Sequence, residues 1–263
     1  MKTEIYYFTG TGNSLAITKE LAKKITGAKI INIAKAVRGN LETSADKIGI
    51  VFPVYFFGLP LMVVDFIKKL KIKKSNYNFA ITNYGGMPGA SLPQLAKMFK
   101  NKGLKLSAGF GIKMPDNYIP LYDTAKIYNK KIMNNIYQNM KKKINVIVEH
   151  VKKQNPYKME KNNFLVNLIV SGLLYNIFAP RFSNLDRKFW ANENCNSCKI
   201  CYKICPAKNI VMKNKLPEWQ HKCEQCFACL HWCPKEAIQY SQKTETRSRY
   251  QNPNVNVKEL FVN

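Results

Sequence analysis

Five short apolar runs in the first half of the chain predict the strands of a sheet. They are EIYYF (4–8), KIINI (29–33), KIGIVFPV (47–54), NFAIT (78–82) and LKLSAGFGI (104–112). Helical stretches separate most of them, although the link between the second and third, residues 34–46, has no clear helical repeat. Apolar strands alternating with helices are typical of a parallel sheet covered on both faces. The expected fold class is therefore α/β, with a doubly wound five-stranded parallel sheet.

The expected strand order is 2-1-3-4-5, which places a ligand site at one edge of the sheet. Doubly wound sheets bind ligands at the carboxyl ends of their strands, where the strand order reverses. In this order the reversal lies between the first and third strands. The loops that begin at Thr9 and Pro53 are therefore the first candidates for binding.

The loop TGTGNS, residues 9–14, follows the first strand and opens a helix that contains residues 15–25. Its glycines let the backbone approach a ligand, while the helix N-terminus and hydroxyls supply uncharged donors for a phosphate. The loop lacks the lysine of a triphosphate loop, and Leu15 stands where a dinucleotide loop has its third glycine. A lone phosphate monoester such as that of FMN remains. The predicted binding residues are Thr9, Gly10, Thr11, Gly12, Asn13 and Ser14.

A strand followed by T-x-T-G-x-S/T and a helix resembles the phosphate loop of flavodoxins. The resemblance implies that aromatic and backbone groups after the third strand flank the flavin ring, and that amides after the fourth strand border its edge. An ordinary hydrophobic strand end and an ordinary tight turn are the alternatives for these two loops. The candidates are Pro53, Val54, Tyr55, Phe56, Phe57 and Gly58 in the second loop, and Asn83, Tyr84, Gly85 and Gly86 in the third.

All eight cysteines lie between Cys195 and Cys233, in the runs CNSCKICYKICP and CEQCFACLHWCP. Disulfides are disfavoured because the chain begins MKTEIYYF, without an apolar signal region, so a cytoplasmic and reducing setting is expected. Structural zinc is a minor alternative, since its cysteines usually come in separated pairs. The spacing C-x2-C-x2-C-x3-C-P favours iron-sulfur clusters.

The second run repeats the first after 28 positions, so the segment is an internal duplication. The spacing resembles that of bacterial two-cluster ferredoxins, where three cysteines of one run and the last cysteine of the other hold each 4Fe-4S cluster. This resemblance implies a first thiol set of Cys195, Cys198, Cys201 and Cys233, and a second thiol set of Cys223, Cys226, Cys229 and Cys205.

Taken together, the chain resembles a flavodoxin-ferredoxin fusion. The resemblance implies a flavodoxin-like FMN-binding domain at 1–155, a helical linker or docking segment at 156–190, a small α+β ferredoxin domain with two 4Fe-4S clusters at 191–242, and a tail at 243–263. The segment RYQNP, residues 249–253, resembles the tail that follows the second cluster in these fusions, but a solvated tail is the favoured prediction.

The net charge of the chain indicates which binding partners to expect. The formal net charge is +26, from 42 Lys and Arg against 16 Asp and Glu; two clusters and FMN would reduce it to about +20. Because only five of the cations are arginine, no nucleic-acid partner is expected. The lysine-rich stretch 141–161 is either a solvated face, a contact for an acidic redox protein or a peripheral contact with an anionic membrane.

The longest apolar stretch, residues 164–179, is too short for a transmembrane segment, and burial between domains or a helix on the membrane surface are the two hypotheses for it. The predicted function is electron transfer between FMN and two 4Fe-4S clusters within one chain, and from there to a protein partner, as an iron-sulfur flavoprotein of the oxidoreductase class. One alternative is an FMN-dependent reductase of a small molecule, fed by the clusters. Another is a basic binding scaffold whose flavodoxin-like domain is empty.

Overall fold

The computed structural model describes residues 1–160, 175 and 179–262. The chain forms two compact units. The sheet unit comprises Met1–Thr9, Asn13–Met114 and Asn134–Ala179, and the cysteine unit comprises Gly10–Gly12, Pro115–Met133 and Pro180–Asn263. Two stretches that the sequence places in the first domain, Gly10–Gly12 and Pro115–Met133, therefore group with the cysteine-rich part by their contacts.

The sheet unit contains a five-stranded parallel sheet. Its strands are β1 (Thr3–Tyr7), β2 (Ala28–Asn32), β4 (Lys47–Pro53), β6 (Tyr77–Tyr84) and β7 (Ala108–Lys113). They run in the order β2-β1-β4-β6-β7, so the predicted order 2-1-3-4-5 is confirmed. Every residue of β1 is buried, including the polar Thr3 and Glu4, as expected for a central strand covered on both faces.

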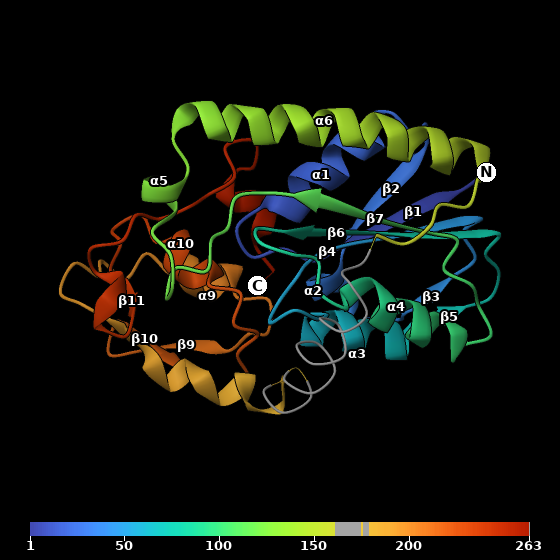
Figure 1. Ribbon diagram of the computed structural model, residues 1–263. Coiled ribbons are helices and arrows are strands. Elements are labelled where there is room, and N and C mark those ends of the chain that lie inside the picture. The colour runs from blue at the N-terminus through green and yellow to red at the C-terminus, as the bar shows by residue number, and fades with distance from the viewer. Residues whose placement is uncertain (161–174, 176–178, 263) are drawn as a thin grey trace. The chain divides into compact units, whose positions relative to one another are not determined.

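Helices cover both faces of this sheet (Figure 1). Helices α1 (Asn13–Ala22) and α6 (Lys130–Lys153) lie on one face, and α3 (Leu61–Lys69) and α4 (Ser91–Lys100) lie on the other. Lys47, a buried cation of β4, donates from Nζ to the carbonyl oxygens of Val151 (2.7 Å) and Lys152 (3.2 Å). It thereby satisfies carbonyl groups in the last turn of α6, which anchors that helix to the sheet.

The link between the second and third predicted strands has more structure than its sequence indicates. It contains the short helix α2 (Ile33–Ala36) and the two-residue strand β3 (Glu42–Thr43), which pairs in parallel with β5 (Lys71–Ile72). Asn32 caps α2, because its Oδ1 accepts from the Ala34 amide at 2.8 Å. Elements of two to four residues are too short to produce a hydrophobic period, so sequence patterns miss them.

The cysteine unit is small and mixed, with short helices and two-stranded ladders. Strand β8 (Phe189–Ala191) pairs antiparallel with β11 (Ile238–Tyr240), and β9 (Ile210–Lys213) pairs antiparallel with β10 (Leu216–Trp219). The remaining elements are α5 (Thr124–Ile127), α9 (Ile200–Ile204), α10 (Ala228–His231) and the 3₁₀ helices η2 (Ala179–Lys188), η3 (Gln242–Thr244) and η4 (Val257–Leu260).

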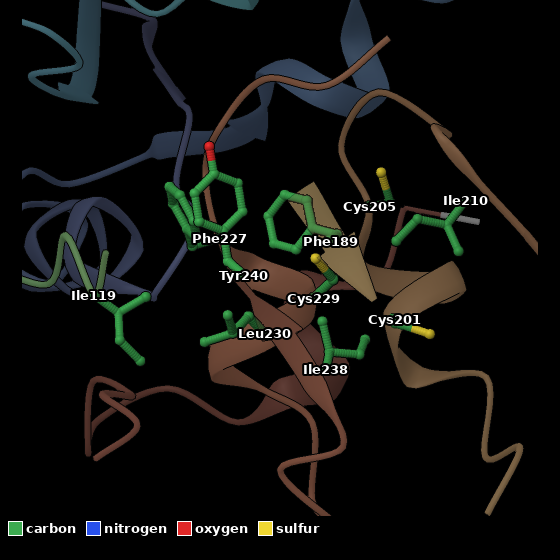
Figure 2. Close-up of a cluster of buried hydrophobic side chains, with 10 residues drawn as sticks. All are labelled: Ile119, Phe189, Cys201, Cys205, Ile210, Phe227, Cys229, Leu230, Ile238 and Tyr240. Carbon is green, nitrogen blue, oxygen red and sulfur yellow. The ribbon is translucent and has the colours of Figure 1, made fainter. Parts of the chain in front are cut away.

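An aromatic core surrounds the thiols of this unit (Figure 2). Phe189 lies edge-on to Tyr240 with ring centroids 4.8 Å apart, and Phe227 lies edge-on to Tyr240 at 5.1 Å. Cys201 and Cys229 are buried in the same cluster. Edge-to-face rings pack at close to crystalline density, so they fix the chain around the thiols without help from long secondary structure.

The predicted apolar helix at 164–179 lies outside the described residues apart from Tyr175 and Ala179, so both hypotheses about it stay predictions. Tyr175 is buried and donates from its hydroxyl to the Leu59 carbonyl at 2.6 Å. Across the part of the chain that the structure describes, no helix combines the length and apolarity that a membrane crossing needs.

Candidate functional site

The two cysteine runs share one backbone conformation, offset by 28 residues. Helices α9 and α10 begin at equivalent positions, and so do strands β9 and β11. A positive φ at a residue other than glycine is uncommon and costs energy. Three equivalent pairs nevertheless share it: Ser197 and Gln225, Lys199 and Phe227, and Lys208 and Glu236. The duplication seen in the sequence is therefore also a duplication of backbone shape.

The first thiol set lines one cavity. Its four members, Cys195, Cys198, Cys201 and Cys233, line this cavity together with Met212, Pro217 and Ile238. Burial raises the pKa of Cys201 to about 12, and the charges of Cys233, Cys198 and Cys195 act in the same direction. Cys198 is exposed, so this group of thiols has access to solvent.

The second thiol set is also brought together. Burial raises the pKa of Cys223 and Cys229 well above the usual range of a thiol, and it raises that of Cys226 to about 12. The charge of Cys205 raises all three of these pKa values further. The last cysteine of the first run thus lies near three thiols of the second run, and the crossed grouping stays a prediction. That these thiols bind clusters remains a prediction.

The chemistry of the two thiol sets fits a 4Fe-4S cluster in each. All eight cysteines are free thiols. Burial raises the pKa of Cys201, Cys223, Cys226 and Cys229 and favours their protonated form, so a strongly positive metal centre is needed to hold these four as thiolates. Among the described residues, no three His, Cys, Asp or Glu side chains converge closely enough to hold one metal ion. A four-iron cube takes one thiolate on each iron, so its ligands need not converge on a single point.

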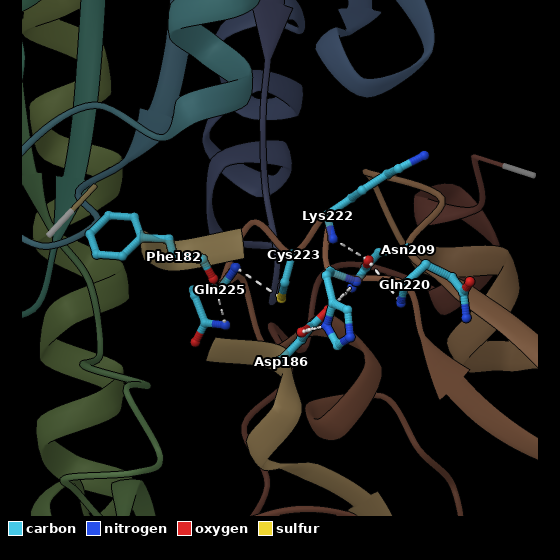
Figure 3. A network of polar contacts seen from close by, with 8 residues as sticks. Phe182, Asp186, Asn209, Gln220, Lys222, Cys223 and Gln225 are labelled. Atoms are coloured by element: carbon cyan, nitrogen blue, oxygen red, sulfur yellow. Dashed lines mark hydrogen bonds and ion pairs between the residues drawn. The ribbon is translucent and has the colours of Figure 1, made fainter. Parts of the chain in front are cut away.

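Asp186 supports the second thiol set from outside both cysteine runs (Figure 3). Its carboxylate is 1% exposed and accepts from Asn209 Nδ2 and from the His221 amide, both at 2.8 Å. It also lies 2.7 Å from His221 Nδ1. A buried carboxylate is stable only when its oxygens are satisfied in this way. Sequence analysis missed Asp186, because nothing in the spacing of the cysteines points to it.

Asn209 connects this carboxylate to the thiols. Its backbone amide donates to Cys205 Sγ at 3.2 Å, and its Oδ1 accepts from the Lys222 amide at 2.5 Å. The Gln225 amide donates to Cys223 Sγ at 3.3 Å. Amide hydrogen bonds to sulfur stabilise negative charge on the ligand and influence the reduction potential of a bound cluster.

The phosphate loop leaves the sheet at the carboxyl end of β1, where the Phe8 amide donates to the Val51 carbonyl at 2.9 Å. Thr9, Asn13 and Ser14 belong to the sheet unit, and Gly10–Gly12 belong to the cysteine unit. Gly12 has a φ of +98°, and a Cβ there would lie 3.1 Å from Asn252 Cβ. Only glycine suits both the conformation and the space.

The hydroxyls of this loop fit a phosphate. Ser14 Oγ accepts from Asn83 Nδ2 at 2.7 Å, and Thr11 Oγ1 accepts from Asn117 Nδ2 at 2.8 Å. A hydroxyl that accepts one hydrogen bond keeps its own O–H as a donor. In the sheet unit, the Ser14 hydroxyl and the start of the ten-residue helix α1 are donors that suit a phosphate monoester, and in the cysteine unit the Thr11 hydroxyl is another such donor.

The second loop is a tight turn with aromatic residues at its tip. Tyr55 and Gly58 exchange two backbone hydrogen bonds of 3.1 and 2.9 Å, and the residues between them, Phe56 and Phe57, both have positive φ. Such turns normally use Asn and Gly, so two phenylalanines store strain there. Phe57 is 39% exposed. The turn presents an apolar ring surface at the carboxyl end of β4.

The third loop begins next to the second. Asn83 is paired with Pro53, and its carbonyl accepts from the Val54 amide at 2.9 Å. Farther along, Gly89 has a φ of +58° and its Cβ would lie 2.1 Å from the Phe57 carbonyl oxygen, so the loop packs directly on the aromatic turn. Tyr84, Gly85 and Gly86 lie between these points, partly or fully exposed.

The segment RYQNP packs inside the cysteine unit, so the favoured prediction of a solvated tail is wrong. Tyr250 and Asn252 are 4% and 1% exposed. The Tyr250 amide donates to His231 Nδ1 at 3.1 Å. His231 Nε2 must therefore carry the proton, and it donates to the Asn117 carbonyl at 2.9 Å. Burial lowers the pKa of His231 to about 4, so this histidine is neutral and both of its ring nitrogens are used.

A short stretch of the chain is similar to a curated protein. No protein-family model matches the chain. An uncharacterised protein of Methanocaldococcus jannaschii is 39% identical over 57 residues, which cover 22% of this chain and 23% of that protein. The chain thus matches less than a quarter of the length of this curated relative.

Two solved structures illustrate the similarity to flavoproteins. A flavodoxin from the domain Archaea is 16% identical, with 58% of this chain and 99% of that chain covered and a TM-score of 0.36. An FMN-dependent NADH-azoreductase of Bacillus anthracis, solved in complex with FMN, is 11% identical, with 57% and 99% covered and a TM-score of 0.39. Because TM-scores below 0.5 do not establish a shared fold, the fold assignment rests on the strand order of this chain.

Proposed function

We propose that this protein is an electron-transfer flavoprotein that holds one FMN and two 4Fe-4S clusters. The observation that carries the proposal is the coincidence of two sites in one chain. A loop rich in uncharged donors stands at the switch point of a 2-1-3-4-5 sheet, and two groups of four thiols, seven of them buried or partly buried and Cys198 exposed, share a duplicated backbone. FMN exchanges electrons singly or in pairs and a cluster exchanges them one at a time, so their combination suits conversion between the two.

The residues of the chain have separate tasks in this proposal. Thr11, Ser14 and the loop amides hold the phosphate, and the strained turn at Phe56 and Phe57 presents rings to the flavin. The two thiol sets hold the clusters, with Asp186 and Asn209 fixing the second. The aromatic core around Phe227 keeps water from the buried sulfurs.

The partner in this proposal is an acidic redox protein, on the grounds of charge complementarity. Lys141 and Lys142 on α6 are exposed. Lys143, in contrast, forms an ion pair with Glu160 and lies over the Tyr157 ring, 5.6 Å from its centroid. We therefore assign partner attraction on this helix to Lys141 and Lys142.

Anaerobic purification followed by iron, sulfide and flavin analysis tests the cofactor content. We expect about eight irons and eight sulfides per chain, together with about one FMN that binds far more tightly than riboflavin, which lacks the phosphate. Thr11→Asp should abolish FMN retention and leave the iron content unchanged, because it places a carboxylate against the phosphate. Stoichiometric zinc without sulfide, or equal affinity for FMN and riboflavin, would contradict the proposal.

Stopped-flow reduction tests whether the two kinds of cofactor exchange electrons within one chain. When the clusters are reduced first, flavin reduction should follow at a rate that does not depend on protein concentration. A rate that rises in proportion to protein concentration would show exchange between molecules, and the proposed function would then be wrong.

A further inference from the structure

The middle of the phosphate loop is held by residues that stand between cluster cysteines. Trp232 is 5% exposed and donates from its indole Nε1 to the Gly10 carbonyl at 3.1 Å, across a sequence separation of 222 positions. It directly precedes Cys233 of the first thiol set and follows Cys229 of the second by three positions. Trp232, which lies in the sequence between a cysteine of each thiol set, thus contacts the loop that we assign to the flavin phosphate.

A second connection runs through Asn117. Its backbone carbonyl accepts from His231, and its side-chain amide donates to Thr11 Oγ1. The Thr11 carbonyl accepts from the Asn252 amide at 2.9 Å. All of these contacts lie within the cysteine unit, so Gly10–Gly12 are shaped by the part of the chain that carries the thiols.

Peptide geometry converts these contacts into an orientation. In a trans peptide unit the carbonyl oxygen and the following amide hydrogen point in opposite directions. Because the Gly10 carbonyl faces Trp232, the Thr11 amide of the same peptide unit points away from Trp232. An amide that points out of a glycine-containing loop is a donor that suits an anion.

We propose that Trp232 and Asn117 are positioning residues for the phosphate loop, through which cluster assembly and FMN retention are linked. This inference rests on the proposed function, because it takes FMN as the ligand of the loop. One cluster at Cys229 and the other at Cys233 fix the two ends of the segment between them, and that order is transmitted to Gly10 by the Trp232 indole. By thermodynamic reciprocity, FMN on the loop should in turn stabilise the clusters.

Replacement of the indole donor tests the inference. Trp232→Phe keeps an aromatic ring but removes the hydrogen bond to Gly10, and it should weaken FMN binding by about 3- to 10-fold, the range expected for one hydrogen bond. Binding of riboflavin should be unchanged, because riboflavin has no phosphate to contact the loop. The measurement is anaerobic titration of each flavin, followed by its fluorescence, into protein that contains its clusters.

A matched control is Trp219→Phe. Trp219 lies in the same unit and its buried indole nitrogen has no hydrogen-bond partner among the described residues, so the same substitution removes an N–H without removing a bond. Its FMN affinity should equal that of the wild type. Asn117→Leu, which removes the side-chain donor to Thr11 and keeps the backbone carbonyl, gives an independent variant if Trp232→Phe does not fold. It should also weaken FMN and spare riboflavin.

The link itself is measured by the release of iron to a chelator. In the wild type, saturating FMN should slow the release by several-fold, and in Trp232→Phe it should have little effect. If both variants bind FMN as tightly as the wild type, or lose FMN and riboflavin equally, the inference is wrong while FMN binding stands. If the wild type binds no FMN at all, the proposed function itself is wrong.

Discussion

The two cysteine runs have the same backbone but different surroundings. Helix α9 of the first run exposes Tyr202 and Lys203, whereas all four residues of α10 in the second run are buried. Lys203 corresponds to His231, 28 positions later. An exposed cation in the first copy is therefore replaced by a buried neutral histidine in the second. The spacing of the cysteines therefore determines the shape of each copy, while the residues between them determine what the copy contacts.

The two copies also differ in how their thiols are supported. Asn209 links Asp186 to Cys205 and corresponds to Ala237 in the second copy. The methyl side chain of Ala237 cannot hydrogen-bond to a carboxylate, so the first set lacks this link. The first set instead lines a cavity that reaches the exposed Cys198. The comparison indicates one thiol set that is accessible to solvent and one that is built into a buried polar network.

Exchange of single cysteines should have the largest effect on this comparison. Cys205→Ser should remove the cluster of the second set and leave the other, so iron should fall from about eight to about four per chain. Cys233→Ser should do the reverse. The surviving cluster can be assigned by its spectrum, since the two sets lie in different environments. Loss of the first-set cluster in Cys205→Ser would refute the crossed grouping.

Removal of the buried carboxylate should have the next largest effect. Asp186→Ala leaves the Asn209 side chain and the His221 amide without their acceptor, and should lower the free energy of unfolding by about 3 kcal/mol. Denaturant unfolding of the purified protein measures it. As a control, Glu218→Ala breaks only a solvent-exposed pair with Lys213 and should change this energy by less than about 0.5 kcal/mol. Equal effects would show that the network does not support the second copy.

Solvent access should produce a smaller difference in kinetics. Iron should be released to a chelator several-fold faster from Cys205→Ser, which keeps the accessible first set, than from Cys233→Ser, which keeps the second. Anaerobic absorbance measurements follow both reactions. The same rate in both variants would mean that the structural difference between the copies has no effect on their clusters.

The smallest effect concerns the basic surface. Charge reversal at Lys141 and Lys142 should slow reduction by an acidic carrier by about two- to threefold at low salt, and this difference should vanish at high salt. Reversal at Lys143 should mainly disturb its pair with Glu160, and so should act on stability more than on encounter. A rate that does not depend on ionic strength would remove α6 from the docking surface.

Regular patterns in the sequence predicted the large elements. They did not predict the individual contacts between residues that are distant in the sequence. The five strands and their order follow from apolar runs and helices, because burial on both faces leaves a strong signal. The grouping of the thiols is implied by the resemblance of their spacing to that of bacterial two-cluster ferredoxins. The assignment of Gly10–Gly12 to the cysteine unit could not be predicted from the sequence, because Trp232 and Asn252 reach them from more than 200 positions away. The role of Asp186 could not be predicted from the sequence either, because it is a single carboxylate outside any motif.

The long separation between Gly10 and Trp232 has a consequence for biosynthesis. Gly10 leaves the ribosome early, but its hydrogen-bond donor follows 222 positions later. At about 5–20 residues per second, the loop waits on the order of ten to forty seconds before the groups that shape it have been synthesised. The sheet can form in that interval, since its strands all precede Pro115. The sheet strands of the nascent protein are therefore all available before the phosphate loop is complete, and flavin is expected to be captured only after synthesis of the cysteine unit.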